Sequence, residues 1–137
     1  MVLVDSNVLI DIVADDAQWF DWSIGQVENA RRDGLLLIND IVYAESSARY
    51  QHIADYENFL DRIGILRVPI PAEALFLAGK VFADYRRLGG TKTGVLPDFF
   101  IGAHAVISGL PLLTRDVRRY RTYFPSIDLI APDNHPT

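Results

Sequence analysis

Short apolar runs alternate with longer amphipathic segments along the chain, and the two periods predict different elements. Short, mostly apolar runs, typical of strands covered on both faces, predict strands at 2–4, 35–38, 65–68, 112–114 and 127–130. Apolar positions that recur every three or four residues predict helices at 7–14, 17–32, 41–50, 56–63, 72–88 and 98–108. Glycine and proline turns separate several of these segments.

This alternation indicates an α/β domain with a largely parallel sheet covered by helices. The segment 98–113 is apolar almost all round, so we expect a buried helix that leads into a central strand. The 137 residues fit a single domain, 1–137, and no repeat or linker divides them. We expect 131–137 to be a frayed tail.

Composition narrows the class of protein further. Half of the residues are apolar and 23% are charged, which supports a buried core and argues against disorder. Cysteine is absent, which excludes disulfides and thiolate metal sites. No basic residue precedes the first apolar run, and no apolar stretch is long enough for a membrane span, so we expect a cytoplasmic protein without a secretion signal.

The charge is unevenly distributed. The net charge of −5 argues against a nucleic-acid partner, because phosphate contacts need Lys and Arg. Residues 80–121, however, hold eight basic residues against three acidic ones, whereas the remainder holds five against fifteen. One part of the chain could therefore meet a polyanion, although a solvated helix face with a basic turn explains the pattern equally well.

Asp5 and Glu45 lie where a carboxylate is unusual for the local pattern. Asp5 ends the first apolar strand and could cap the next helix, but Ser6 could cap it equally well. Glu45 shares its side of the 41–50 helix with Val42 and Ala48, so its charge falls on the face expected toward the core. A carboxylate there is unfavourable unless something pairs with it.

Asp98 and Asp116 have simpler local explanations. Asp98 opens the apolar helix directly after Pro97, where an acid is favoured by the helix dipole. Asp116 lies two residues past the 112–114 strand and could cap a short segment at 117–120. Asp40 is interpreted as an ordinary N-cap.

The expected position of the four acids at one edge of the sheet indicates a common site. In a parallel sheet the strands end, and the following helices begin, at one edge, where ligand sites lie. Asp5, Glu45, Asp98 and Asp116 are all expected there. Clustered carboxylates repel one another unless a cation offsets their charge, and oxygen ligands favour Mg²⁺ or Mn²⁺ over zinc.

Four segments resemble the PIN-domain family and, within it, the toxin ribonucleases of bacterial VapBC-type (type II) toxin–antitoxin modules. They are VLVDSNVLIDI, NDIVYAES, GVLPDFFIGAHA and LLTRDVRRYRTYFP, and their order and spacing match the family across nearly the whole chain. The resemblance implies a three-layer α/β/α sandwich with a mainly parallel sheet of about five strands. It also implies a homodimer and a small antitoxin partner that blocks the site.

Carried over by position, the resemblance makes the four acids the catalytic and metal-binding residues of an endoribonuclease. One or two Mg²⁺ or Mn²⁺ ions would be bound, and RNA would be the substrate. The residues that would then serve as polar partners of the acids are Ser6, Asn7 and Thr114.

Three basic residues are candidates for contact with RNA. Arg86 and Lys92 flank the glycine-containing turn before Asp98, and Arg115 adjoins Asp116. A solvated helix-end charge explains Arg86 at least as well, so Arg115 is the preferred candidate.

One histidine and two tryptophans are expected to have structural roles. His104 lies six residues after Asp98, about 120° around the helix, so we expect it to face away from the acids and pack in the core. Trp19 and Trp22 are expected in the core or in a subunit interface.

Two alternative functions stay open. A phosphatase could use Asp5 as a covalent nucleophile, but that chemistry expects a second acid two residues later, where Asn7 stands. A non-catalytic interaction module could use the acids only to bind a stabilising ion.

Overall fold

The computed structural model describes residues 1–132, and five parallel strands form its central sheet. The strands are β1 (Val2–Val4), β2 (Leu36–Ile38), β3 (Ile65–Arg67), β4 (Leu112–Leu113) and β5 (Leu129–Ile130). The helices are α1 (Ser6–Val13), α2 (Phe20–Asp33), α3 (Asp40–Ser46), α4 (Ile53–Ile63), α5 (Ala72–Arg87), α6 (Pro97–Ser108) and α7 (Arg118–Tyr123). The strand order is β3-β2-β1-β4-β5, which confirms the predicted α/β fold with a parallel sheet.

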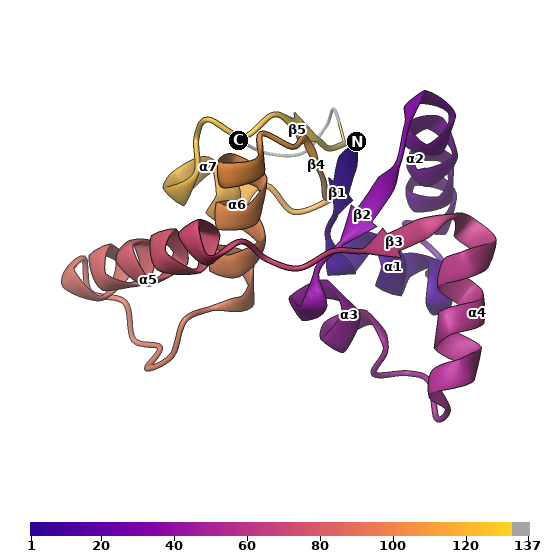
Figure 1. The fold of residues 1–137 in the computed structure, drawn as a ribbon, viewed down its shortest axis with the longest axis horizontal. Helices are drawn as coiled ribbons and strands as arrows, with labels where there is room; N and C mark the ends of the chain where they lie inside the picture. Colours follow the sequence, from indigo (N-terminus) through magenta and orange to yellow (C-terminus); the bar gives the residue numbers. More distant parts are fainter. Residues whose placement is uncertain (133–137) are drawn as a thin grey trace.

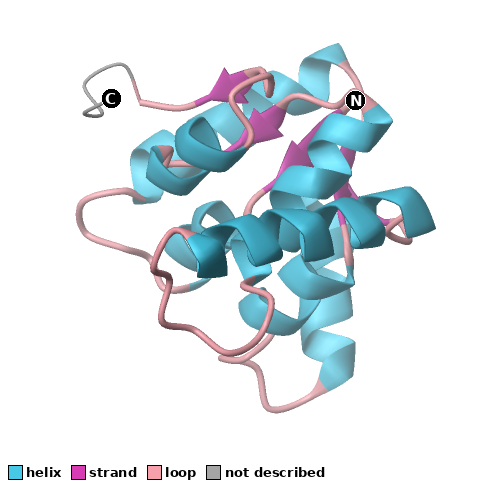
Figure 2. Cartoon of the chain, turned by 90° about the vertical axis from the view of Figure 1, so that its left-hand side faces the viewer, coloured by secondary structure: helices cyan, strands magenta, loops and turns pink. Residues whose placement is uncertain are grey.

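The direction of chain progression reverses at β1. The chain passes from β1 outward to β2 and β3, then crosses back to β4 and continues to β5. Because parallel crossovers are right-handed, this reversal puts α5, α6 and α7 on the face opposite α1 to α4. Figure 1 shows the two groups of helices on opposite sides of the strands, and Figure 2 shows the strands between nearer and farther helices. The three-layer α/β/α arrangement is thus present.

The core lies on the inner strands. Every residue of β2 and β4 is buried, as are Leu3 and Val4 of β1. The helix α6 is also deeply buried, in agreement with its apolar sequence, and leads into the inner strand β4. At the edge strand β3 the expectation of two covered faces is wrong, because Leu66 and Arg67 are exposed there.

Local hydrogen bonds moved several element boundaries from their predicted positions. The helix α2 begins at Phe20 rather than at residue 17, because the Asp16 carboxylate accepts from the backbone N–H groups of Gln18 and Trp19 and holds a turn. The N-cap of α3 is Asn39, not Asp40, since the Asn39 side chain accepts from a backbone N–H of the first turn.

The frayed tail expected at 131–137 stays a prediction. Pro132 is buried. Residues 133–137 lie outside the described part of the chain. Among the described residues, no helix combines the length and hydrophobicity needed to span a bilayer.

Candidate active site

The site lies at the carboxyl ends of β1 and β4, the point at which the strand order reverses. Crevices at such switch points are the usual ligand sites of open parallel sheets. Asp5 directly follows β1, and Thr114 directly follows β4. The Thr114 hydroxyl donates to Asp5 Oδ2 at 2.8 Å and joins segments 109 residues apart in sequence.

Asp5 is the most buried of the four predicted acids, with 3% of its surface exposed. Its Oδ1 accepts from the Ser6 backbone N–H at 2.7 Å, and its Oδ2 accepts from the Tyr120 hydroxyl at 2.8 Å. Burial raises the pKa of Asp5 from 3.8 to about 6, although the hydrogen bond from Tyr120 opposes the rise. Asp5 is also the N-cap residue of α1, so the same carboxylate serves the helix and the site.

Glu45 reaches Asp5 through a shared hydroxyl. Ser6 Oγ donates to Glu45 Oε1 at 2.9 Å and lies 3.4 Å from Asp5 Oδ1. Burial raises the pKa of the half-buried Glu45, and the Ser6 hydrogen bond lowers it. The apolar face predicted around Glu45 is only partly correct, because Val42 is buried whereas Ala48 lies beyond the end of α3 and is exposed.

Asp98 and Asp116 lie on the more open side of the site. Asp98 is in the first turn of α6, and Arg119 Nη1 donates to its Oδ2 at 3.3 Å. Asp116 follows β4, and its carboxylate accepts from the backbone N–H of Arg118 at 3.3 Å in a turn before α7; the N-cap of that helix is Val117, so the expectation that Asp116 caps it is wrong. The Asp116 side chain is 54% exposed.

The acids influence one another electrostatically, and Asp98 is common to these interactions. Burial is the largest cause of the raised pKa at Asp5, Glu45 and Asp98. The charge of Asp98 raises the pKa of Asp5 and Glu45 further, and the charge of Asp116 does the same to Asp98. The structure therefore brings the four predicted acids into one electrostatic group.

Asn7 and Thr114 form a hydrogen-bond network next to Asp5. The Thr114 hydroxyl accepts from the Asp116 backbone N–H at 3.1 Å and from Asn7 Nδ2 at 3.2 Å. Asn7 Oδ1 in turn accepts from the Arg115 backbone N–H at 3.3 Å. The three polar residues expected beside the acids, Ser6, Asn7 and Thr114, all contact them.

The basic candidates are placed differently from one another. Arg115 forms a two-point ion pair with the buried Asp11, through Nε at 2.7 Å and Nη2 at 2.9 Å, and its guanidinium lies over the Trp19 ring. Its side chain therefore points away from Asp116 toward α1 and α2. Arg86, in the last turn of α5, and Lys92, in the loop that follows α5, are both exposed, and the Arg86 side chain donates to the Lys92 carbonyl oxygen.

Two residues that contribute to the site, Tyr120 and Asp11, were not predicted from the sequence. Tyr120 is 1% exposed, and its hydroxyl contacts Asp5 from the last described helix. Asp11 is 1% exposed and accepts from Ser23 as well as Arg115, so it links α1, α2 and the loop after β4. Tyr120 lies four residues after Asp116 in sequence, and this nearness to a predicted acid is the signal that could have found it.

The remaining aromatic and histidine predictions concern the core. His104 is buried and lies 3.1 Å from Asn39, away from the acids as expected. Trp19 and Trp22 are half-buried and meet edge to face, with ring centroids 6.0 Å apart.

The donor set fits a hard divalent cation in type, since it consists of carboxylate and hydroxyl oxygens. Within residues 1–132, however, no three His, Cys, Asp or Glu side chains are gathered closely enough to hold one ion directly. Mg²⁺ binds through one or two carboxylates and keeps several of its waters. The arrangement therefore fits an ion held partly through water rather than an all-protein cage.

Comparison with solved structures shows the same fold at low sequence identity. The chain matches "VapBC2 from Rickettsia felis bound to a DNA fragment from their promoter" with a TM-score of 0.72 and 18% identity, covering 97% of this chain and 100% of that one. It matches "DNA bound VapBC from Salmonella typhimurium" with a TM-score of 0.69 and 20% identity, covering 96% and 98%. It matches "VapBC-1 from nontypeable Haemophilus influenzae" with a TM-score of 0.66 and 17% identity, again covering 96% and 98%.

Sequence comparisons gave one family and no individual relative. A search of curated proteins found no match. The PIN domain family matches residues 2–125, which include every strand but β5 and all of the acidic site. The chain belongs to the PIN domain family.

Proposed function

We propose that this protein is an Mg²⁺- or Mn²⁺-dependent endoribonuclease and the toxin of a type II toxin–antitoxin pair. The observation that carries the proposal is the electrostatic group of four acids at the sheet's switch point, centred on Asp98 and the buried Asp5. Membership of the PIN domain family supports a nuclease. The structural neighbours come from complexes described as VapBC or as toxin–antitoxin, which supports the toxin assignment.

Asp5, Glu45 and Asp98 would hold the principal ion, directly or through waters, and Asp116 would complete the group or recruit a second ion. A bound divalent cation lowers the pKa of a coordinated water and offsets charge on the phosphate under attack. The protein prepares the site by fixing the Asp5 carboxylate with donors from Ser6, Thr114 and Tyr120.

The raised pKa values of Asp5, Glu45 and Asp98 support this proposal as well. Neighbouring carboxylates repel one another when they are ionised. A bound cation offsets this repulsion, and the group therefore binds a cation more strongly than separate carboxylates would. The exposed side of the group, formed by Asp98 and Asp116, leaves room for an RNA strand to approach.

The test is cleavage of a structured RNA pool by the wild type and the Asp98→Asn variant, each with Mg²⁺, Mn²⁺ or EDTA. We expect metal-dependent cleavage by the wild type and at least a hundredfold loss in the variant, in the range of removing one key electrostatic group. The exposed Asp128→Asn variant is the matched control and should cleave like the wild type.

The alternative functions give different results in the same experiments. An aspartyl-phosphate enzyme would be trapped by beryllofluoride at Asp5, which the ribonuclease would not. Metal-dependent stability without RNA cleavage would favour a non-catalytic interaction module.

The proposed partners are a second copy of the chain and a small antitoxin. Leu75 and Phe76 are exposed on α5 and could lie in an interface between copies. A basic antitoxin side chain placed near the acids would block the site by charge-assisted hydrogen bonds. Co-purification from the native host, followed by light scattering, tests both partners, and a monomer without any small partner would contradict them.

A further inference from the structure

Two arginines close to the acidic site are held very differently. Arg115 makes a two-point ion pair with Asp11, whose side chain is 1% exposed. Arg119 makes a single contact of 3.3 Å with Asp98, and the two side chains are 40% and 37% exposed. A half-exposed, single-contact pair is weak, so Arg119 can leave Asp98 whereas Arg115 is fixed.

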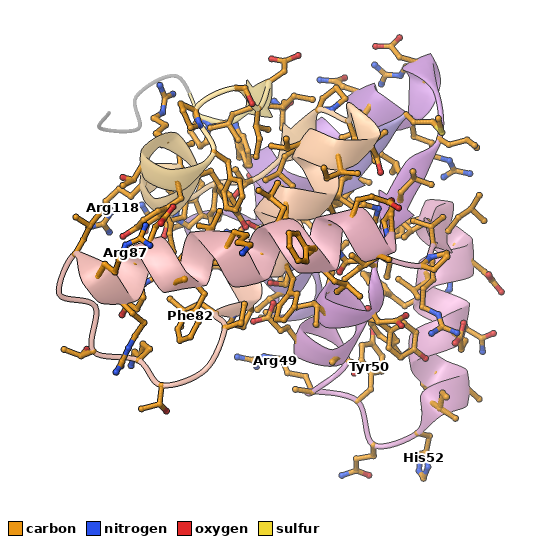
Figure 3. The ribbon with its side chains drawn as sticks, turned by 60° about the vertical axis from the view of Figure 1, so that its left-hand side comes forward. Arg49, Tyr50, His52, Phe82, Arg87 and Arg118 are labelled. Carbon is orange, nitrogen blue, oxygen red and sulfur yellow. The ribbon has the colours of Figure 1, made fainter. Side chains whose placement is uncertain are left out.

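Arg119 lines a surface hollow that contains both acidic and basic side chains. An open hollow of about 470 Å³ is lined by Asp98, Asp116, Arg118, Arg119, Thr122 and Tyr123. Arg118, labelled in Figure 3, is 83% exposed, and its Nε lies 3.9 Å from Asp116 Oδ1, whereas Arg119 Nη1 lies 3.3 Å from Asp98 Oδ2. A cation at Asp98 and a phosphate beside it would both lie within reach of this side chain.

We propose that Arg119 and a divalent cation compete for Asp98, and that the guanidinium displaced by the cation contacts a phosphate of the RNA strand. The inference rests on the proposed function and adds to it a named residue for substrate binding. Guanidinium groups suit both partners, because their planar donors match carboxylates and phosphates alike.

The environment of Asp98 supports this competition. Burial raises the pKa of Asp98, and the charge of Arg119 is the main influence that lowers it. Arg119 thus stabilises the same ionised carboxylate that a cation would use. Its neighbour Tyr120 is buried and donates to Asp5 Oδ2 at 2.8 Å, so α7 is anchored by a contact that does not involve the Arg119 side chain.

The first test measures Mn²⁺ binding by isothermal titration calorimetry, without RNA. Removal of the competitor in Arg119→Gln should make Mn²⁺ binding about two- to fivefold tighter, the range expected for a half-exposed ion pair. Arg121→Gln removes the same charge from an exposed position on the same helix and should change binding less. Arg119→Lys, which keeps a cation, should restore affinity toward the wild-type value.

The second test measures binding of a labelled single-stranded RNA by fluorescence anisotropy with Ca²⁺ present, over a series of salt concentrations. Loss of one phosphate contact in Arg119→Gln should weaken binding and reduce the slope of log affinity against log salt by about 0.7. An unchanged slope would overturn the phosphate contact.

The outcomes separate this inference from the proposed function. A wild type that binds no Mn²⁺ would remove the proposed metal-dependent function itself. Normal Mn²⁺ binding by the wild type with equal affinity in Arg119→Gln would leave that function standing and overturn the competition. Circular dichroism of each variant confirms that it is folded before either comparison is made.

Discussion

Replacing Asp5 with Asn should stabilise the metal-free protein at neutral pH even though it removes the proposed activity. The Asp5 carboxylate is 3% exposed, and burial is the main reason why its pKa rises from 3.8 to about 6. The folded protein therefore binds a proton more readily than the unfolded chain between these pH values. Its stability falls as pH rises through this window, because the folded state must give up that proton.

The size of the effect follows from the shift. A rise of about two pKa units corresponds to about 3 kcal/mol of stability lost above pH 6. Asn avoids this loss, but its amide cannot accept every hydrogen bond that Thr114 and Tyr120 donate to Oδ2. One weakened hydrogen bond costs about 1 kcal/mol, so we expect a net gain of about 1–3 kcal/mol at pH 8.

Urea unfolding in EDTA at pH 8 and pH 4 measures this gain. Asp5→Asn should be more stable than the wild type at pH 8, and the difference should nearly vanish at pH 4, where Asp5 of the wild type is largely protonated. Asp128→Asn removes an exposed carboxylate and should show no such change between the two pH values. A variant less stable than the wild type at pH 8, or a difference that is the same at both pH values, would refute the reasoning.

Three further predictions concern packing and metal binding. Arg115→Met leaves the buried Asp11 carboxylate without its cation and should lower the free energy of unfolding by about 3–5 kcal/mol in urea; a loss below about 1 kcal/mol would contradict the ion pair's role. In Gly102→Ala the added Cβ would overlap the Phe124 ring, so we expect a loss of about 1–3 kcal/mol, partly restored by Phe124→Leu in the same chain. Mg²⁺ at about a hundred times its dissociation constant should stabilise the wild type by about 2.7 kcal/mol in thermal unfolding, and Asp98→Asn should lose most of this gain.

Element type and order were predictable because burial imposes a period on the sequence. Apolar runs marked every strand, and the alternation with helices fixed the parallel topology. The shared sheet edge then placed Asp5 and Thr114 together, although 109 residues separate them. This part of the site follows from topology alone, since the carboxyl ends of neighbouring parallel strands must meet.

Side-chain direction was the part that sequence could not supply. Arg115 and Asp116 are neighbours in sequence, but Arg115 turns to Asp11 across 104 residues while Asp116 stays beside Thr114. The pairing depends on where α1 and the loop after β4 meet, which no local pattern encodes. The prediction of the α3 N-cap was wrong for a similar reason. Asn39 and Asp40 are both favourable N-cap residues, and only the residue at which the helix begins shows which of them is the cap.

The span of the site along the chain has a consequence during translation. The contacts on Asp5 come from Ser6, the next residue in sequence, and from Tyr120, which lies 115 residues later. A ribosome-bound chain that has not yet exposed residue 120 carries Asp5 without its Tyr120 hydrogen bond, and before residue 112 the central strand β1 lacks β4 beside it. Because domains form as their residues emerge, the four acids come together only after Asp116 and Tyr120 have left the ribosome, so Asp5 is synthesised long before the group that it belongs to can form.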